Sequence, residues 1–226
     1  MIGALWKALA QLSDPRLARV LKLGILGALA AYVTLVVIIW TVLANVSLFT
    51  NAWADWSSDL AIGALALVLP ILFFPALATT IMGPMLDGVA DAVEARHYPH
   101  LAAARPQPVA EVILGTLRFL ALTVVINLAA LPVYGLLLFT GLTVVLATAI
   151  NGYLLGREYF EMAALRRLEP AMVRALFKAR LGQVWLAGVI IAFLFSVPLL
   201  NLAAPVIAAA FMTHVAETLR MRANTV

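Results

Sequence analysis

The chain has 226 residues, of which 65% are hydrophobic and only 12% are charged. Soluble domains carry about twice that share of charge, and so few charges could not cover this much apolar surface in water. The composition excludes a water-soluble enzyme, a disordered segment and a nucleic-acid-binding module, and it predicts an all-α integral membrane protein. The chain has no cysteine, which excludes disulfides, thiol nucleophiles and thiolate metal ligands.

The first residues have the pattern of an amphipathic helix. Apolar side chains recur at helical spacing, and Lys7 and Gln11 fall on the opposite side. This pattern predicts a helix over 1–13 that lies on the inner surface of the membrane, and it differs from the pattern of a cleavable signal peptide. The apolar positions are Ile2, Leu5, Trp6, Leu9 and Leu12.

Two long uncharged stretches follow. Asp14 before Pro15 is typical of an N-cap followed by proline at the first helical position, so we expect the first long helix over 15–46. Its apolar part is longer than the roughly 20 residues that cross a bilayer. We expect a second crossing helix over 60–97, with a cytoplasmic extension and proline kinks. The kinks are expected at Pro70, Pro75 and Pro84.

The final uncharged stretch is too short for two crossings and a turn, which need roughly 40–45 residues. It is interrupted at 196–201, and the stretch before it has a comparable break at 131–135. We expect re-entrant helical hairpins over 112–165 and 170–222, although a tight pair of spans also fits the first. The whole chain is expected to form one membrane domain, 1–226.

The basic residues indicate how the chain is oriented. Lysines and arginines, 15 against 11 acidic residues, precede the first long helix, follow the second and flank the two hairpins, whereas segment 47–59 has none. By the positive-inside rule, all basic segments and both termini are cytoplasmic. The rule gives the same sides whether the hairpins penetrate partly or cross completely.

Common catalytic and nucleotide-binding motifs are absent from the sequence. There is no phosphate-cradling loop, zinc-protease motif, nucleophile elbow or dinucleotide fingerprint. His97, His100 and His214 are too scattered to indicate a metal site. We therefore expect a protein that is not an enzyme and has no catalytic residues, metal or other cofactor.

The start of the first long helix is a candidate anion site. Arg16 and Arg19 are three residues apart, one turn on one face, beside a helix N-terminus whose dipole favours anions. Two guanidinium groups there could hold a tetrahedral oxyanion such as sulfate. Alternatively, both arginines anchor the chain to lipid headgroups. Asp14 counts against the anion site, because its carboxylate can occupy the same helix end.

Acidic residues Asp87, Asp91 and Glu94 share one face of a helix. The simplest interpretation is a solvated helix surface; the alternatives are a cation site and a gate formed with arginines elsewhere. Arg157 and Glu161 are placed for an intrahelical ion pair or for the mouth of a polar pathway. The residues that we consider for a pore or gate are Glu94, Arg96, Arg118, Arg157, Glu158 and Glu161.

In this organisation the chain resembles the CysZ family of sulfate permeases from bacterial inner membranes. An amphipathic helix leads into a Pro-x-Leu-x-Arg segment at 15–19, and a proline-rich stretch runs into an acidic helix over 74–96. An Asn-x-Tyr-Leu-Leu-Gly-Arg-Glu-Tyr stretch covers 151–159, and a basic tail follows the last hairpin. The likeness covers nearly the whole chain.

The resemblance implies two long transmembrane helices, two partly penetrating hairpins and a homo-oligomer. It also implies channel-like uptake of sulfate, or of a related oxyanion such as sulfite, for cysteine synthesis, without an ATPase partner. The family's sulfate-associated Gly-Leu-Arg segment corresponds to Arg16, Leu17 and Ala18, with Arg19 next, so the glycine is replaced by Arg16. The alternative function is a membrane scaffold or assembly protein that transports nothing.

Overall fold

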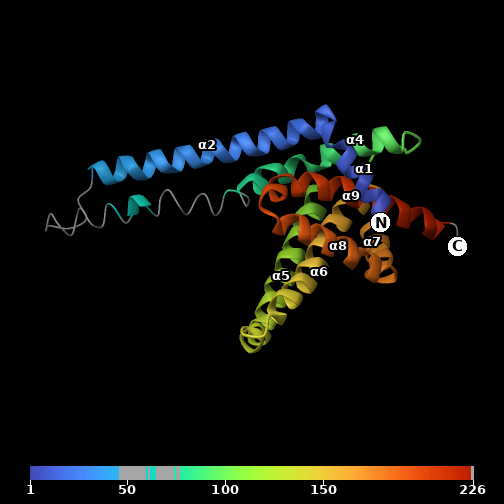
Figure 1. Cartoon of the computed structure of the whole chain (residues 1–226). Coiled ribbons are helices and arrows are strands. Elements are labelled where there is room, and N and C mark those ends of the chain that lie inside the picture. Colours follow the sequence, from blue (N-terminus) through green and yellow to red (C-terminus); the bar gives the residue numbers. More distant parts are fainter. Residues whose placement is uncertain (46–59, 61, 65–73, 75–76, 225–226) are drawn as a thin grey trace.

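A computed structural model describes residues 1–45, 60, 62–64, 74 and 77–224, and every regular element in these residues is helical (Figure 1). Three of the described helices are long and apolar enough to cross a membrane, and they lie over Pro15–Val42, Val109–Leu137 and Leu200–Ala223. The elements are α1 (Ile2–Ala10), η1 (Gln11–Ser13), α2 (Pro15–Asn45), η2 (Gly83–Met85), α4 (Leu86–His97), α5 (Val109–Leu137), α6 (Leu142–Ala164), α7 (Pro170–Ala179), α8 (Leu181–Ser196) and α9 (Pro198–Asn224).

Helix α9 forms the centre of the structure. Its residues Ile207, Phe211 and Met212 are fully buried, and α1, α4, α6 and α8 pack around it. Helix α2 and the α5–α6 hairpin extend from this core in different directions (Figure 1). Both expose apolar side chains along their length, as helices in contact with lipid do.

Helices α6 and α8 cross at three glycines. A Cβ atom on Gly188 would lie 1.8 Å from the carbonyl oxygen of Gly152 and 2.6 Å from the Cα of Gly156. Only glycine allows the two backbones to approach so closely. The small-residue pattern of Gly152 and Gly156 thus marks a helix contact, and its partner surface lies on α8.

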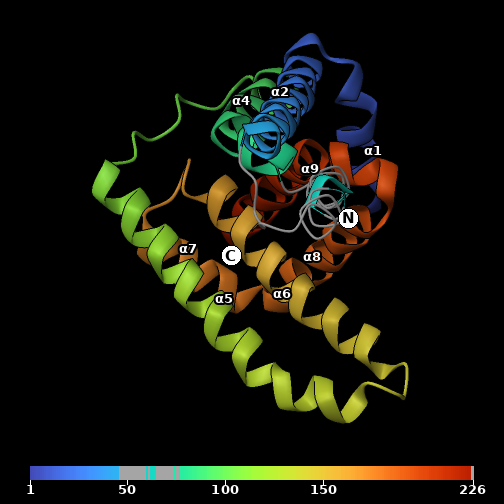
Figure 2. The same cartoon turned by 90° about the vertical axis from the view of Figure 1, so that its left-hand side faces the viewer.

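Helices α5 and α6 lie side by side as a hairpin (Figure 2). The expected break at 131–135 is wrong, because α5 continues through Pro132 to Leu137. The turn comes later, at Gly141, whose φ of 71° lies in the left-handed region that glycine adopts without strain. Pro132 is exposed and is accommodated within the apolar helix α5. Proline alone therefore did not indicate where the hairpin turns.

The second expected hairpin has its break where the sequence indicated it. Helix α8 ends at Ser196 and α9 begins at Pro198. Helix α8 has 16 residues, whereas α9 has 27 and runs on to Asn224 as a buried core helix. Helix α7 precedes α8 and meets it at an angle of 89°.

The N-terminal part follows the sequence pattern closely. Helix α1 and η1 cover the expected amphipathic segment, and α2 begins at Pro15. The expected polar side of this segment is wrong in one respect: Gln11, in η1, is buried, and its amide donates to the carbonyl oxygen of Ala92, 3.1 Å away. The segment 47–59, Pro70 and Pro75 lie outside the described residues. Pro84 falls in η2, directly before α4, which is consistent with a kink there.

Candidate functional site

The acidic face of α4 is held by two consecutive arginines that follow α6. The Nε of Arg166 donates to Glu94 over 3.1 Å, and its Nη atoms contact Asp91 and Asp87. Arg167 pairs with the other oxygen of Glu94 and also donates to the carbonyl of Ala102. The interpretation of this face as a solvated surface is therefore wrong for Glu94: it is joined to arginines 72 and 73 residues away.

Arg166 is one of the most deeply buried charges among the described residues, with 5% of its side chain exposed. Burial disfavours its charged form, but hydrogen bonds to Glu94 and Asp91 outweigh this effect and raise the pKa of Arg166 above its ordinary value. The arginine is consequently charged at any physiological pH. Glu94 was predicted as a gate residue, whereas Arg166 and Arg167 were not, because the alternative of a gate formed with arginines elsewhere did not indicate which arginines.

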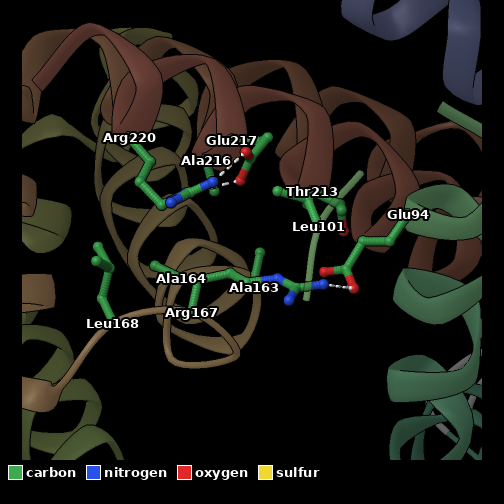
Figure 3. A pocket seen from close by; sticks show the side chains of 10 residues that line it. All are labelled: Glu94, Leu101, Ala163, Ala164, Arg167, Leu168, Thr213, Ala216, Glu217 and Arg220. Carbon is green, nitrogen blue, oxygen red and sulfur yellow. Dashed lines mark hydrogen bonds and ion pairs between the residues drawn. The ribbon is translucent and has the colours of Figure 1, made fainter. Parts of the chain in front are cut away.

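A narrow slot lies beside this network, between α4, α6 and α9 (Figure 3). The Glu94–Arg167 pair lines one side, and Glu217 and Arg220 form a second pair 2.5 Å apart on the other. Thr213 lies between them and donates its hydroxyl to its own helix. The free space is about 10 Å³, roughly enough for one water molecule and too little for a sulfate ion.

Arg105 fixes the chain on either side of the network. Its guanidinium pairs with Glu111 at the start of α5 and donates to the carbonyl of Leu165 over 3.3 Å. Its backbone N–H donates to the carbonyl of Arg166 over 2.9 Å. The segment before α5 and the turn after α6 are thus joined where Arg166 leaves the helix.

The predicted anion site lies at the start of α2. Arg16 and Arg19 are exposed and make no ion pair within the described part of the chain, whereas Leu17 is fully buried. Asp14 caps the helix, because its carboxylate accepts the N–H of Arg16 over 2.9 Å. The same carboxylate lies 3.9 Å from the guanidinium of Arg96 on α4. Arg96 was expected as a gate residue, but it lies next to the start of α2 and not in the network around Arg166.

The remaining expected gate residues lie around the base of the α5–α6 hairpin. Arg157 and Glu161 form the intrahelical ion pair, 2.7 Å long. Arg118 is exposed and lines a cavity with them. Glu158 faces the neighbouring cavities, which it shares with Phe119 of α5. Among the residues that the structure describes, no ion pair or side-chain hydrogen bond joins these four to the Arg166 network, although Glu158 and Glu161 line one cavity with Asp87.

A histidine pair lies between α1, α4 and α9. The rings of His97 and His214 are 4.8 Å apart, and the Tyr98 hydroxyl lies 2.9 Å from Nδ1 of His214. Nε2 of each histidine is buried without a partner. The chain's His, Asp and Glu side chains form no cluster of three or more suited to a metal, within the residues described.

The apolar helices and the buried charge network together define a multi-pass α-helical membrane protein. The chain matches the family described as sulfate transporter CysZ/Etoposide-induced protein 2.4 over residues 4–205, and it belongs to that family. The resemblance noted in the sequence is thereby confirmed. No curated protein and no solved structure matches the chain significantly.

Proposed function

We propose that this protein carries sulfate across the bacterial inner membrane through a channel-like pathway and so supplies cysteine synthesis. The observation that carries the proposal is the family match over residues 4–205. The buried arginines support it chemically. Guanidinium groups bind tetrahedral oxyanions through paired hydrogen bonds, and this binding is stronger away from bulk water.

In this proposal the charge network is the closed state of the pathway. Arg166 and Arg167 share the carboxylate of Glu94, so each has a partner while no anion is present. An entering sulfate would replace the carboxylate of Glu94 on one guanidinium group. The same carboxylate would later return and displace the sulfate. Binding of this kind stays weak enough for release.

We propose further that Arg16, Leu17 and Arg19 form a first sulfate-binding position, with the backbone of the α2 start as donor. The two arginines are exposed and free of ion pairs in the described structure, which leaves them available to an anion. Arg96 would add a third positive charge near Asp14. The expected pore residues Arg118, Arg157, Glu158 and Glu161 would line the approach at the hairpin base.

The tip of the α5–α6 hairpin supports a re-entrant arrangement. Phe139 at the tip is 95% exposed, and the hydroxyls of Thr140 and Thr143 both donate to the carbonyl of Leu137 over 2.8 Å. Because these two hydroxyls bond to the backbone of the tip itself, they need no water within the membrane. The uncharged part of α6 before Arg157 is about 22 Å long, short of a core of about 30 Å.

We propose that both termini are cytoplasmic, that all basic segments face the same side, and that several copies of the chain assemble in the membrane. The slot inside one chain has room for about one water, so sulfate would need either an opened network or a passage between copies. No ATPase partner is proposed, because binding and release by the arginines require no energy input.

The small slot also favours the second candidate function, a scaffold that transports nothing. A growth test separates the two. A bacterial host without its own sulfate uptake should grow on sulfate as sole sulfur source when it expresses this protein. Added cysteine should restore growth of the host that lacks this protein. Growth that depends on cysteine despite correctly inserted protein would support the scaffold.

A further inference from the structure

A second cavity lies outside the charge network, at the base of the α5–α6 hairpin. Its volume is about 430 Å³, far larger than that of the slot. Three helices supply one arginine each to its lining: Arg118 from α5, Arg157 from α6 and Arg174 from α7. Positive charge from three elements that are distant in the sequence thus surrounds one space.

The charges in this cavity do not cancel one another. Glu161 is already paired with Arg157 at 2.7 Å, and Glu111 is paired with Arg105 outside the cavity lining. Arg118 and Arg174 are exposed and form no ion pair among the residues that the structure describes. Two positive charges are therefore left for an anion.

The first turn of α7 adds to this positive potential. The helix has ten residues, and Pro170 and Val173 of its first turn line the cavity. Glu169, the N-cap residue, makes no side-chain hydrogen bond to the helix, so the terminal N–H groups have no carboxylate cap. The helix dipole then acts in the same direction as the arginines.

The other walls of the cavity are apolar. Leu114, Leu165 and Val173 form them, and the outer surface of α5 next to the cavity exposes Ile113 and Leu117. This surface belongs to a helix suited to cross the membrane. A ligand that fits both parts has a negatively charged head and an apolar tail that continues along α5 into the lipid.

We propose that this cavity binds the phosphate headgroup of an anionic phospholipid between Arg118 and Arg174, with the acyl chains against α5. The shared chemistry is a tetrahedral oxyanion, and a free sulfate ion is the other source of it. The apolar walls favour the lipid, since a small inorganic anion gains nothing from Leu114 or Val173. The bound lipid would join α7 to the hairpin.

Native mass spectrometry of the full-length protein, released from nanodiscs of phosphatidylglycerol and phosphatidylcholine, tests this proposal. We expect retained phosphatidylglycerol in the wild type and at least a tenfold loss in R118Q/R174Q. The control K178Q/R180Q removes the same charge at the far end of α7, and it should keep the lipid. Circular dichroism and gel filtration establish that each variant is folded.

Equal retention of phosphatidylglycerol by R118Q/R174Q and the wild type, or equal retention of phosphatidylcholine, would overturn the proposal. A further arm adds sodium sulfate, with sodium chloride at the same ionic strength as its control. Displacement of the lipid by sulfate alone would overturn the lipid assignment in favour of free sulfate. Because this assay measures no transport, its result is independent of whether the protein carries sulfate.

Discussion

Glu94 on α4 and Arg166 after α6 are 72 residues apart in the chain, yet the Nε of Arg166 donates to Oε1 of Glu94 over 3.1 Å. Only 5% of the Arg166 side chain and 11% of the Glu94 side chain are exposed. The pair connects the acidic helix to the end of the first hairpin. Removal of either side chain would leave the other charge buried without full compensation, at a large cost in stability.

Arg166→Met should destabilise the protein by about 3 kcal/mol, because it removes the buried guanidinium that joins α4 to the end of α6 and leaves the buried carboxylate of Glu94 with Arg167 alone. The stability of Arg166→Lys should lie between that of the wild type and that of Arg166→Met, since one ammonium group keeps the charge but cannot form the forked contact. The control Arg19→Met removes an exposed arginine and should cost far less. Denaturant unfolding in mixed micelles measures the difference. Equal losses in Arg166→Met and Arg19→Met would contradict the importance of the network.

Gly188→Ala should disrupt the crossing of α6 and α8. The new Cβ would lie 1.8 Å from the backbone oxygen of Gly152, and backbone cannot move aside as a flexible side chain can. We expect a loss of about 1–3 kcal/mol or more. Gly182→Ala on the same helix is the matched control, because a Cβ added there would have no neighbouring atom within 4 Å. Thermal melting in detergent should show a lower Tm for Gly188→Ala only.

The histidine pair should make stability depend on pH. Burial, and the positive charges of Lys7 and Arg96, lower the pKa of His97 below its ordinary 6.5. Above pH 6.5 the ring is neutral in both the folded and the unfolded chain, so it contributes nothing. Below pH 6.5 the unfolded chain binds the proton first, and the free energy of unfolding falls until the folded pKa is reached.

The Tm should therefore decrease between pH 7.5 and 5.5, and His97→Gln should reduce that decrease. His214 lies 4.8 Å from His97, and Nε2 of His97 is buried without a hydrogen-bond partner, so a proton on that nitrogen would be poorly solvated. His100→Gln is the control, because that ring is exposed beyond the end of α4. A wild-type Tm that stays constant over this range would refute the argument.

Asp14→Asn tests the anion site at the start of α2. Asparagine is as good an N-cap as aspartate, so the helix keeps its cap while a negative charge beside Arg16 is removed. Sulfate affinity should rise about two- to fivefold, in line with a local interaction of about 0.3–1 kcal/mol. Titration calorimetry of the purified protein measures this change. An unchanged or lower affinity would remove Arg16 and Arg19 from the sulfate pathway.

Local signals in the sequence predicted local structure well. Asp14 and Pro15 marked the beginning of α2, and Pro198 marked the beginning of α9, since caps and prolines act on their own neighbourhood. Pro132 was misleading for the same reason. A proline at that position can end a helix or be accommodated within it, and the choice depends on surroundings that the local sequence does not contain.

Long-range partners could not be found from the sequence. Gly152 and Gly156 are four residues apart, a spacing typical of close helix contacts, but nothing local points to Gly188 as their partner. Likewise a gate between the acidic face of α4 and arginines elsewhere was only an alternative, and nothing distinguished Arg166 from the other basic residues that satisfied the charge rule. The burial of Gln11 was missed because its position in the amphipathic pattern looked polar, whereas its amide bonds to the backbone of α4.

Sulfate flux into liposomes that contain only this protein would show directly whether it transports sulfate. We expect saturable uptake of labelled sulfate that is the same with and without a proton gradient, because exchange between arginines and carboxylates needs no coupling ion. Uptake that requires the gradient would contradict the channel-like pathway. No uptake, in vesicles shown to hold folded protein, would contradict transport itself and leave the scaffold as the function.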